Sequence, residues 1–386
     1  MNVSIGLRVI QSFLLRSLPF QSVLIGCCLA GLSCILSNFL QGATSYSNDF
    51  ISSSLNPFST HSDMMQYRLL IPLLGYITGL KGQYYYILSL LGNVLFLIMT
   101  SYWALKFYQS KLTAFLLASC MAALPVVLLN DSYYGWSDVF CYALLLMALL
   151  SPRYCPLIIF MGLTTHEFFF AYIPFIFLYH YRFHPHFFED KRKLIKIILG
   201  LLAALLIYSL IRSWITSRLT PQLTTTFYLS SIKDNGPFYQ LTLPPLLAGL
   251  ISAYKMSLIL FIPFLYFVLR YIRSKTLDVL VLVSTLLPLL LLILAHDVTR
   301  LISNTFIFIL LFPKYIPHMR NGLLTFILLG NLLIPSFCFD PYSRLALDKQ
   351  AVGILKKVNS HQGGYDAFGK YLHDFDIKAL IKLCSS

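Results

Sequence analysis

Charged residues are scarce in this sequence: Asp, Glu, Lys and Arg together make up 11% of its 386 positions. A soluble domain of this length needs about a quarter of its residues charged to cover its surface. Apolar residues reach 58%, and the mean hydropathy is +0.73. These values exclude an ordinary soluble enzyme and predict a chain that is solvated mainly by lipid.

The sequence also lacks the patterns of several other protein classes. Its 8 cysteines include no Cys-x-x-Cys pair and no zinc-finger spacing, which argues against a thiolate metal site. The net charge of +14 does not indicate nucleic-acid binding, because no basic stripe interleaved with aromatic residues occurs. Many basic residues instead form short clusters at the ends of apolar runs, where they anchor cytoplasmic loops. We expect no nucleic-acid partner.

Apolar runs near the twenty residues that cross a bilayer recur along the chain. They predict an all-α fold, a polytopic transmembrane helical bundle of about 10–11 spans with short juxtamembrane helices at the outer face. The clear spans are 18–40, 84–105, 111–129, 138–150, 193–213, 253–271, 277–295, 300–316 and 320–337. The resulting regions are a cytoplasmic N-terminus (1–17), the transmembrane domain (18–337) with outer loops 41–83 and 214–252, and a small tail (338–386), expected at the outer face.

Two stretches leave the topology open. Tyr67–Leu80 is apolar but short, and Cys155–Tyr179 is long enough for one span although Thr164–Glu167 interrupts its middle. If Tyr67–Leu80 stays outside and Cys155–Tyr179 is two short helices that meet outside, most basic loops fall inside. The alternative, in which each stretch is a single span, moves three basic residues outside and only one inside. The positive-inside rule therefore favours the first topology.

Ionisable residues at membrane depth cost free energy, so their positions are the best indication of function. In the favoured topology the outer face collects most of the acidic residues of the transmembrane domain. We predict catalytic roles there for four acids and binding roles for five other residues. The catalytic candidates are Asp49, Asp131, Asp138 and Glu167, and the substrate-binding candidates are Arg68, His166, His296, Asp297 and Arg300.

Structural roles compete with these functional ones. Asp131 or Asp138 could cap a helix, and His296, Asp297 and Arg300 could form an ion pair at a helix start. His166 and Glu167 are harder to explain structurally, because apolar residues flank them on both sides.

The string Tyr67-Arg68-Leu69-Leu70-Ile71-Pro72-Leu73-Leu74 resembles the Tyr-Arg-x-x-x-Pro-Leu-Leu stretch of mannosyltransferase-like members of the GT-C superfamily. These membrane glycosyltransferases take sugar from a polyprenyl phosphate. The resemblance covers roughly residues 18–337 and rests on architecture more than on a strict motif. It implies a catalytic acid in the first outer loop, where Asp49 stands, and short helices along the membrane in that loop. The acidic pair that is common in the family is absent from this loop.

The chemistry of such a reaction assigns roles to the candidates. Inverting sugar transfer needs a carboxylate that takes the proton of the acceptor hydroxyl, for which Asp49 is the candidate. The phosphate leaving group needs a cation or a divalent metal such as Mg²⁺ or Mn²⁺. Arg300, with His296 nearby, is the first candidate for this role, and Arg68 is the second. Asp131, Asp138 or Glu167 would position the acceptor or the metal.

Other functions remain open. The sequence also allows a secondary transporter, because a broken helix with a polar centre is typical of transporter sites. A polysaccharide polymerase or ligase is a further alternative. The expected partners are a lipid-linked sugar donor, membrane lipids and a glycan, lipid or protein acceptor. The expected location is a bacterial inner membrane, within the cell envelope, and the alternative is the endoplasmic reticulum membrane.

Overall fold

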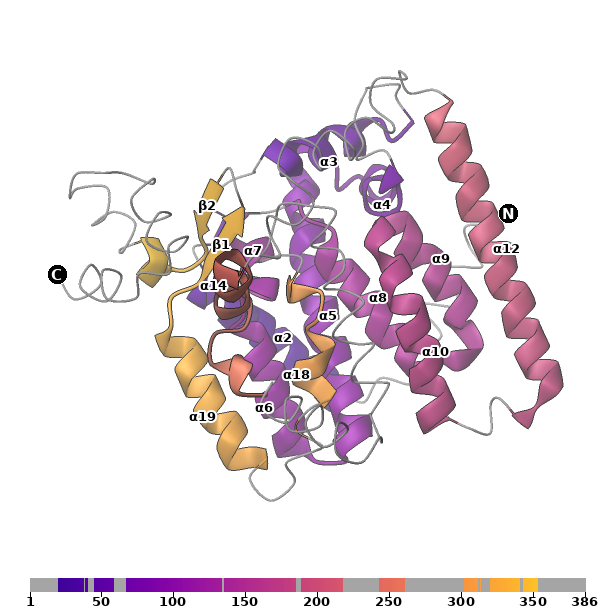
Figure 1. The fold of residues 1–386 in the computed structure, drawn as a ribbon. Coiled ribbons are helices and arrows are strands. Elements are labelled where there is room, and N and C mark those ends of the chain that lie inside the picture. Colours follow the sequence, from indigo (N-terminus) through magenta and orange to yellow (C-terminus); the bar gives the residue numbers. More distant parts are fainter. Residues whose placement is uncertain are drawn as a thin grey trace.

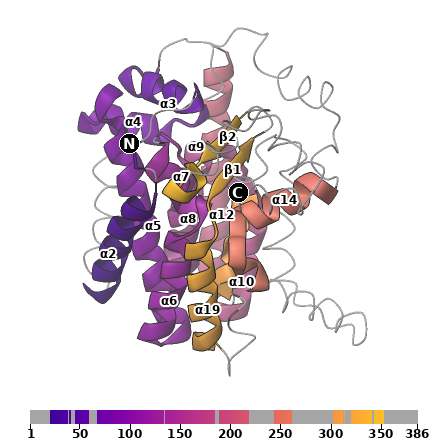
Figure 2. The same cartoon turned by 90° about the vertical axis from the view of Figure 1, so that its left-hand side faces the viewer.

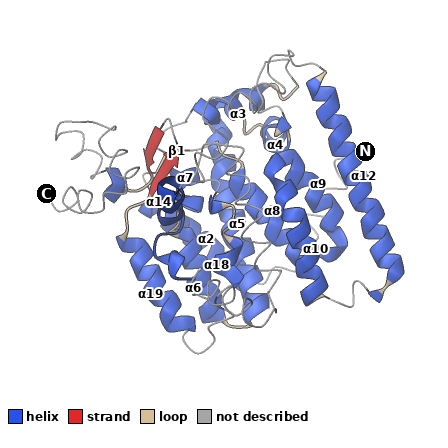
Figure 3. Ribbon diagram, viewed as in Figure 1, coloured by secondary structure: helices blue, strands red, loops and turns tan. Residues whose placement is uncertain are grey.

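In the part of the chain that the computed structural model describes, almost all elements are helices, with one short β-hairpin (Figure 3). The structure describes residues 20–37, 39–40, 45–58, 67–133, 135–184, 189–217, 243–260, 302–311, 313, 320–340 and 343–352. The hairpin joins β1 (Phe337–Asp340) to antiparallel β2 (Ser343–Ala346). The expectation of an all-α chain missed this hairpin, because it lies in the region predicted only as a tail.

Long apolar helices form the body of the molecule (Figure 1). Among the described residues, two helices are long and apolar enough to cross a membrane, Gly82–Tyr108 and Lys191–Thr216. Two bent pairs raise the number to 4 if each is one span: Lys111–Ala122 with Pro125–Ser132, and Asp138–Leu150 with Pro152–Thr165. Shorter apolar helices are Phe20–Leu36, Gly249–Leu260 and Arg320–Leu333. These helices indicate a membrane protein.

Helix α5 (Tyr85–Tyr108) lies in the centre of the bundle and packs against α2 (Phe20–Leu36), α6 (Lys111–Ala122) and α8 (Asp138–Leu150). Aromatic side chains contribute to these contacts. For example, the rings of Phe96 and Tyr142 lie 5.7 Å apart, between α5 and α8.

The packing of α2 on α5 depends on a glycine. A Cβ atom added at Gly26 would come within 2.6 Å of the Ile98 backbone, whereas one added at Gly31 of the same helix meets nothing within 4 Å. Small residues at such positions let membrane helices approach closely.

We therefore expect Gly26→Ala to lower the free energy of unfolding by about 1–3 kcal/mol through overpacking. Gly31→Ala is the matched control, and it should be neutral or stabilising by up to about 1 kcal/mol because Ala favours helix. Thermal unfolding of both variants in detergent measures the difference. Equal effects at the two positions would contradict close packing of α2 on α5.

Two short helices run across one end of the bundle, which we call the upper end (Figures 1 and 2). They are α3 (Ser45–Leu55) and α4 (Leu70–Thr78), and they pack against each other. Helix α4 has 9 residues, about 14 Å of helix, which is half the thickness of a bilayer core. Tyr67–Leu80 is therefore not a span, as the favoured topology predicted.

The ambiguous stretch from Cys155 is broken in the middle. It forms α9 (Cys155–Thr165), the 3₁₀ turn η4 (Glu167–Ala171) and α10 (Tyr172–Phe183). His166 has extended backbone, with φ −161° and ψ 134°, and so separates the two helices. This confirms the predicted pair of short helices.

Helix α12 (Lys191–Thr216) runs along the whole height of the molecule (Figure 1). Its start is capped by Asp190, whose Oδ1 accepts hydrogen bonds from the backbone N–H groups of Arg192 and Lys193. The predicted outer loop 214–252 is too long at both ends, because α12 continues to Thr216 and α14 (Leu243–Tyr254) begins inside the loop. The prolines at 244 and 245 favour a loop in the sequence, but the first turn of a helix accepts proline.

The remaining helices of the bundle are shorter. Helix α6 continues into α7 (Pro125–Ser132) after a bend of 52°. Helix α14 leads into the 3₁₀ helix η7 (Lys255–Leu260), which packs against α18 (Ile307–Leu311) and α19 (Arg320–Leu333). Short 3₁₀ turns η2 (Gly82–Tyr84) and η3 (Pro152–Tyr154) precede α5 and α9.

Candidate functional site

The upper end of the bundle holds a buried ion pair between Arg68 and Glu167. Arg68 Nε donates to Glu167 Oε2 at 3.1 Å, and Nη2 donates to Oε1 at 2.9 Å. The side chains are only 10% and 25% exposed. Two parallel hydrogen bonds fix the orientation of both groups. The pair joins the segment before α4 to the break between α9 and α10.

His166 lies beside this pair and brings a second acid into the site. Its Nε2 is 3.7 Å from Oδ1 of Asp138, the first residue of α8, and its Nδ1 is 3.3 Å from Glu167 Oε2. The Phe168 backbone N–H donates to Nδ1. This hydrogen bond places the proton of a neutral imidazole on Nε2, facing Asp138. The contact with Glu167 then becomes an ion pair only if the ring is protonated.

The charges of His166 and Glu167, which lie in the break outside both α9 and α10, are set by burial and by Arg68. Burial by itself would raise the pKa of the Glu167 carboxyl, but the Arg68 guanidinium holds that pKa well below its usual range. Burial and then the charge of Arg68 lower the pKa of His166. Near neutral pH, therefore, the site contains an ionised Glu167 and a neutral imidazole.

Local packing explains why the chain breaks at this position. The backbone N–H of His166 closes α9 on the carbonyl of Gly162. A Cβ atom at Gly162 would lie 2.5 Å from the Phe169 ring, so only glycine lets this ring fold back against α9. The Ser137 hydroxyl donates to the Thr165 carbonyl at 3.5 Å, which ties the start of α8 to the end of α9.

Helix α3 brings Phe50, the residue after Asp49, against this group. The ring of Phe50 is fully buried and lies 5.9 Å from the guanidinium carbon of Arg68. Asp49 itself is partly exposed. Asp49 is thus adjacent in the chain to the aromatic residue that contacts the Arg68 guanidinium.

A second arginine approaches the site from α12, and sequence reasoning missed it. The Arg212 guanidinium lies 4.6 Å from the centre of the Tyr67 ring, and Nη1 donates to Tyr208 at 3.2 Å. The Tyr67 hydroxyl is 2.9 Å from that of Thr216. In the described part of the chain no carboxylate lies within 4 Å of this guanidinium, unlike that of Arg68. Arg212 is the only basic residue in the second half of a long apolar helix, which could have drawn attention to it.

Asp131 has a different set of neighbours. Its side chain is fully buried between α7, α5 and α2, where Oδ1 accepts from Asn93 at 2.6 Å and from the Cys34 thiol at 3.6 Å. Its backbone carbonyl accepts from Leu40. The structure thus brings Arg68, Asp138 and His166 together with Glu167, and gives Asp131 a place among packed helices.

The predicted group His296, Asp297 and Arg300 lies outside the described residues. Within the described ranges, no three His, Cys, Asp or Glu side chains are arranged to hold a metal ion. Comparisons with protein-family models, curated proteins and solved structures found no match for the chain. The chemistry must therefore be inferred from the site itself.

Proposed function

We propose that this chain is an integral membrane glycosyltransferase of about 10–11 spans, which transfers a sugar from a polyprenyl-phosphate donor at the outer membrane face. The observation that carries the proposal is the convergence of Arg68, Asp138, His166 and Glu167 at one end of the bundle. Two short helices cover this end, as expected for a site reached from the membrane surface.

The distribution of basic residues supports an outward orientation of this end. In the described part of the chain the upper end carries Arg68, Lys81 and Arg212, with Arg344 and Lys349 at the hairpin. The opposite, lower end carries Lys106, Lys111, Arg153, Arg182, Lys191, Arg192, Lys193 and Arg320. Because cytoplasmic loops collect Lys and Arg, the lower end faces the cytoplasm.

In this proposal the catalytic tasks are divided among the site residues. Asp49 is partly exposed and acts as the base that takes the proton of the acceptor hydroxyl. Glu167 neutralises Arg68, so that this pair orients the neighbouring His166 and Asp138. Arg212 has no carboxylate partner among the described residues, so it is available to the phosphate leaving group. A Mg²⁺ or Mn²⁺ ion at this phosphate is the proposed alternative source of positive charge.

Removing the charge of Arg212 should weaken donor binding. A hydrogen bond to a charged group contributes about 1.5–3 kcal/mol, so Arg212→Gln should raise the donor KM about 10- to 100-fold while kcat falls less. Arg212→Lys should recover part of the loss. Steady-state kinetics over a range of donor concentrations checks this, and a fall in kcat alone would remove Arg212 from the donor site.

A direct test of the proposal is donor turnover by the purified protein in lipid vesicles. A panel of polyprenyl-phosphate sugars is supplied, with EDTA or with Mg²⁺ or Mn²⁺, and the released polyprenyl phosphate is measured. We expect release with one sugar of the panel once an acceptor is present. In parallel, the same vesicles are tested for uptake of free sugars and ions. Uptake without any donor cleavage would support a transporter instead.

A further inference from the structure

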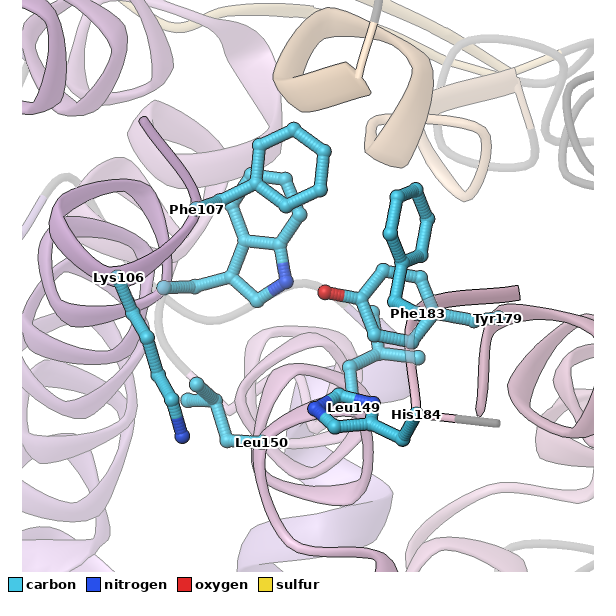
Figure 4. Close-up of a pocket in the computed structure, with 8 residues that line it drawn as sticks. Lys106, Phe107, Leu149, Leu150, Tyr179, Phe183 and His184 are labelled. Carbon is cyan, nitrogen blue, oxygen red and sulfur yellow. The ribbon is translucent and has the colours of Figure 1, made fainter. Parts of the chain in front are cut away.

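A pocket of about 250 Å³ lies at the lower end of the bundle. It opens between the last turns of α5, α8 and α10. Its lining consists of Trp103, Lys106, Phe107, Leu149, Leu150, Tyr179, Phe183 and His184 (Figure 4). None of these residues contributes to the candidate site described above.

The walls of this pocket are aromatic and tightly packed. The Trp103 and Phe107 rings are stacked with their centres 4.5 Å apart. The Phe183 ring contacts Phe107 edge-on at 5.3 Å and Tyr179 at 4.8 Å. Such walls suit glycerol and methylene groups, and Trp and Tyr concentrate where a bilayer meets water.

Two of the polar groups that line the pocket are basic. Lys106 is exposed, and in the described part of the chain no carboxylate lies within 4 Å of its ammonium. His184 lies across from it, with its Nδ1 3.3 Å from that of His180 (Figure 4). The charge of this pocket is therefore complementary to an anion.

We propose that this pocket binds the phosphate head of an anionic membrane lipid of the cytoplasmic leaflet. Lys106 holds the phosphate. His184 lines the opposite side of the pocket, where its Nδ1–H donates to His180 Nδ1, because the His180 Nε2–H donates to the Ala148 carbonyl. The Trp103, Phe107 and Phe183 rings pack against the glycerol and the first acyl methylenes. Basic pockets between helices on the cytoplasmic side are suited to lipid head groups. A free phosphate would satisfy Lys106 but would leave the aromatic walls uncovered. The inference does not depend on the proposed transferase function.

Tryptophan fluorescence can test this proposal, because the chain has 3 Trp residues. With Trp136→Phe and Trp214→Phe, the remaining Trp103 reports on the pocket. The full-length protein is reconstituted in phosphatidylcholine vesicles, and brominated phosphatidylglycerol or brominated phosphatidylcholine is titrated in as quencher. We expect phosphatidylglycerol to quench at an about five-fold lower mole fraction, as one basic residue near an anionic headgroup provides.

Lys106→Gln should abolish this preference. Lys111→Gln is the matched control, because Lys111 is an exposed lysine at the same end that does not line the pocket, and it should retain the preference. Equal losses in both variants, or no preference before substitution, would overturn the proposal in favour of diffuse surface charge.

Relief of quenching by inorganic phosphate beyond that by chloride of equal ionic strength would identify free phosphate as the ligand and overturn the lipid assignment. Lipid that co-purifies with the unsubstituted chain, measured by mass spectrometry, should show the same anionic preference.

Discussion

Asp49→Asn should lower the rate of sugar transfer about 10²- to 10⁴-fold, the usual contribution of a general base. The amide has nearly the shape of the carboxylate but cannot accept the proton of the acceptor hydroxyl. Because Asp49 is partly exposed, the substitution should leave folding intact. The measurement is the release of polyprenyl phosphate at saturating donor, together with the thermal unfolding temperature.

Ser52→Ala is the matched control for this substitution, because Ser52 is an exposed residue of the same helix α3. It should leave the rate within about twofold. Asp49→Glu should retain part of the activity, since the carboxylate is kept but displaced. If Asp49→Asn and Ser52→Ala have equal rates, Asp49 is not the base, and the role passes to another acid of the outer face.

The largest effect on stability is expected from Arg68→Gln. This substitution leaves Glu167 charged and mostly buried, with a side chain only 25% exposed. Removing one partner of a buried pair costs about 3–5 kcal/mol, and we expect the lower end of this range because Glu167 retains some solvent contact. Thermal unfolding in detergent and the yield of folded protein report the loss.

The double variant Arg68→Gln with Glu167→Gln separates stability from function. Two amides can hydrogen-bond to each other without an uncompensated charge, so most of the lost stability should return. Transfer activity should stay low, because His166 loses the charged neighbour that lies 3.3 Å from its Nδ1. Additive losses in the double variant would contradict direct coupling of the two residues.

Part of this architecture could be predicted from local sequence. The polar string at Thr164–Glu167 interrupts an apolar run, and an interruption of this kind ends a helix where its ionisable groups can reach water or a partner. Tyr67–Leu80 is too short to cross a bilayer. By contrast, the bend before α7 was missed although Pro125 marks it, since proline disrupts the hydrogen bonding of a continuous helix.

The arrangement of the site could not be predicted from the sequence, because it depends on contacts between residues far apart in the chain. Arg68 and Glu167 are far apart in the chain, and no local pattern distinguishes this pairing from others among the outer-face residues. Asp131 and Asp138 both lie next to a predicted span at the outer face, so the sequence predicts similar roles for them. In the structure, however, Asn93 and Cys34 donate hydrogen bonds to Asp131. Arg212 could be assigned a role only after the contact of α12 with Tyr67 was known.

We propose that the group around Arg68, His166 and Glu167, with Arg212 at the phosphate, binds the sugar phosphate of a lipid-linked donor. Photo-crosslinking tests it most directly, with a polyprenyl-phosphate sugar that carries a photoreactive group on the sugar. The donor is bound to the protein in vesicles, and the labelled peptides are identified by mass spectrometry. We predict adducts at Asp49 to Arg68 and at His166–Glu167 that an excess of unmodified donor suppresses. Adducts confined to the lower end of the bundle, or labelling that unmodified donor does not suppress, would contradict a donor site at the upper end.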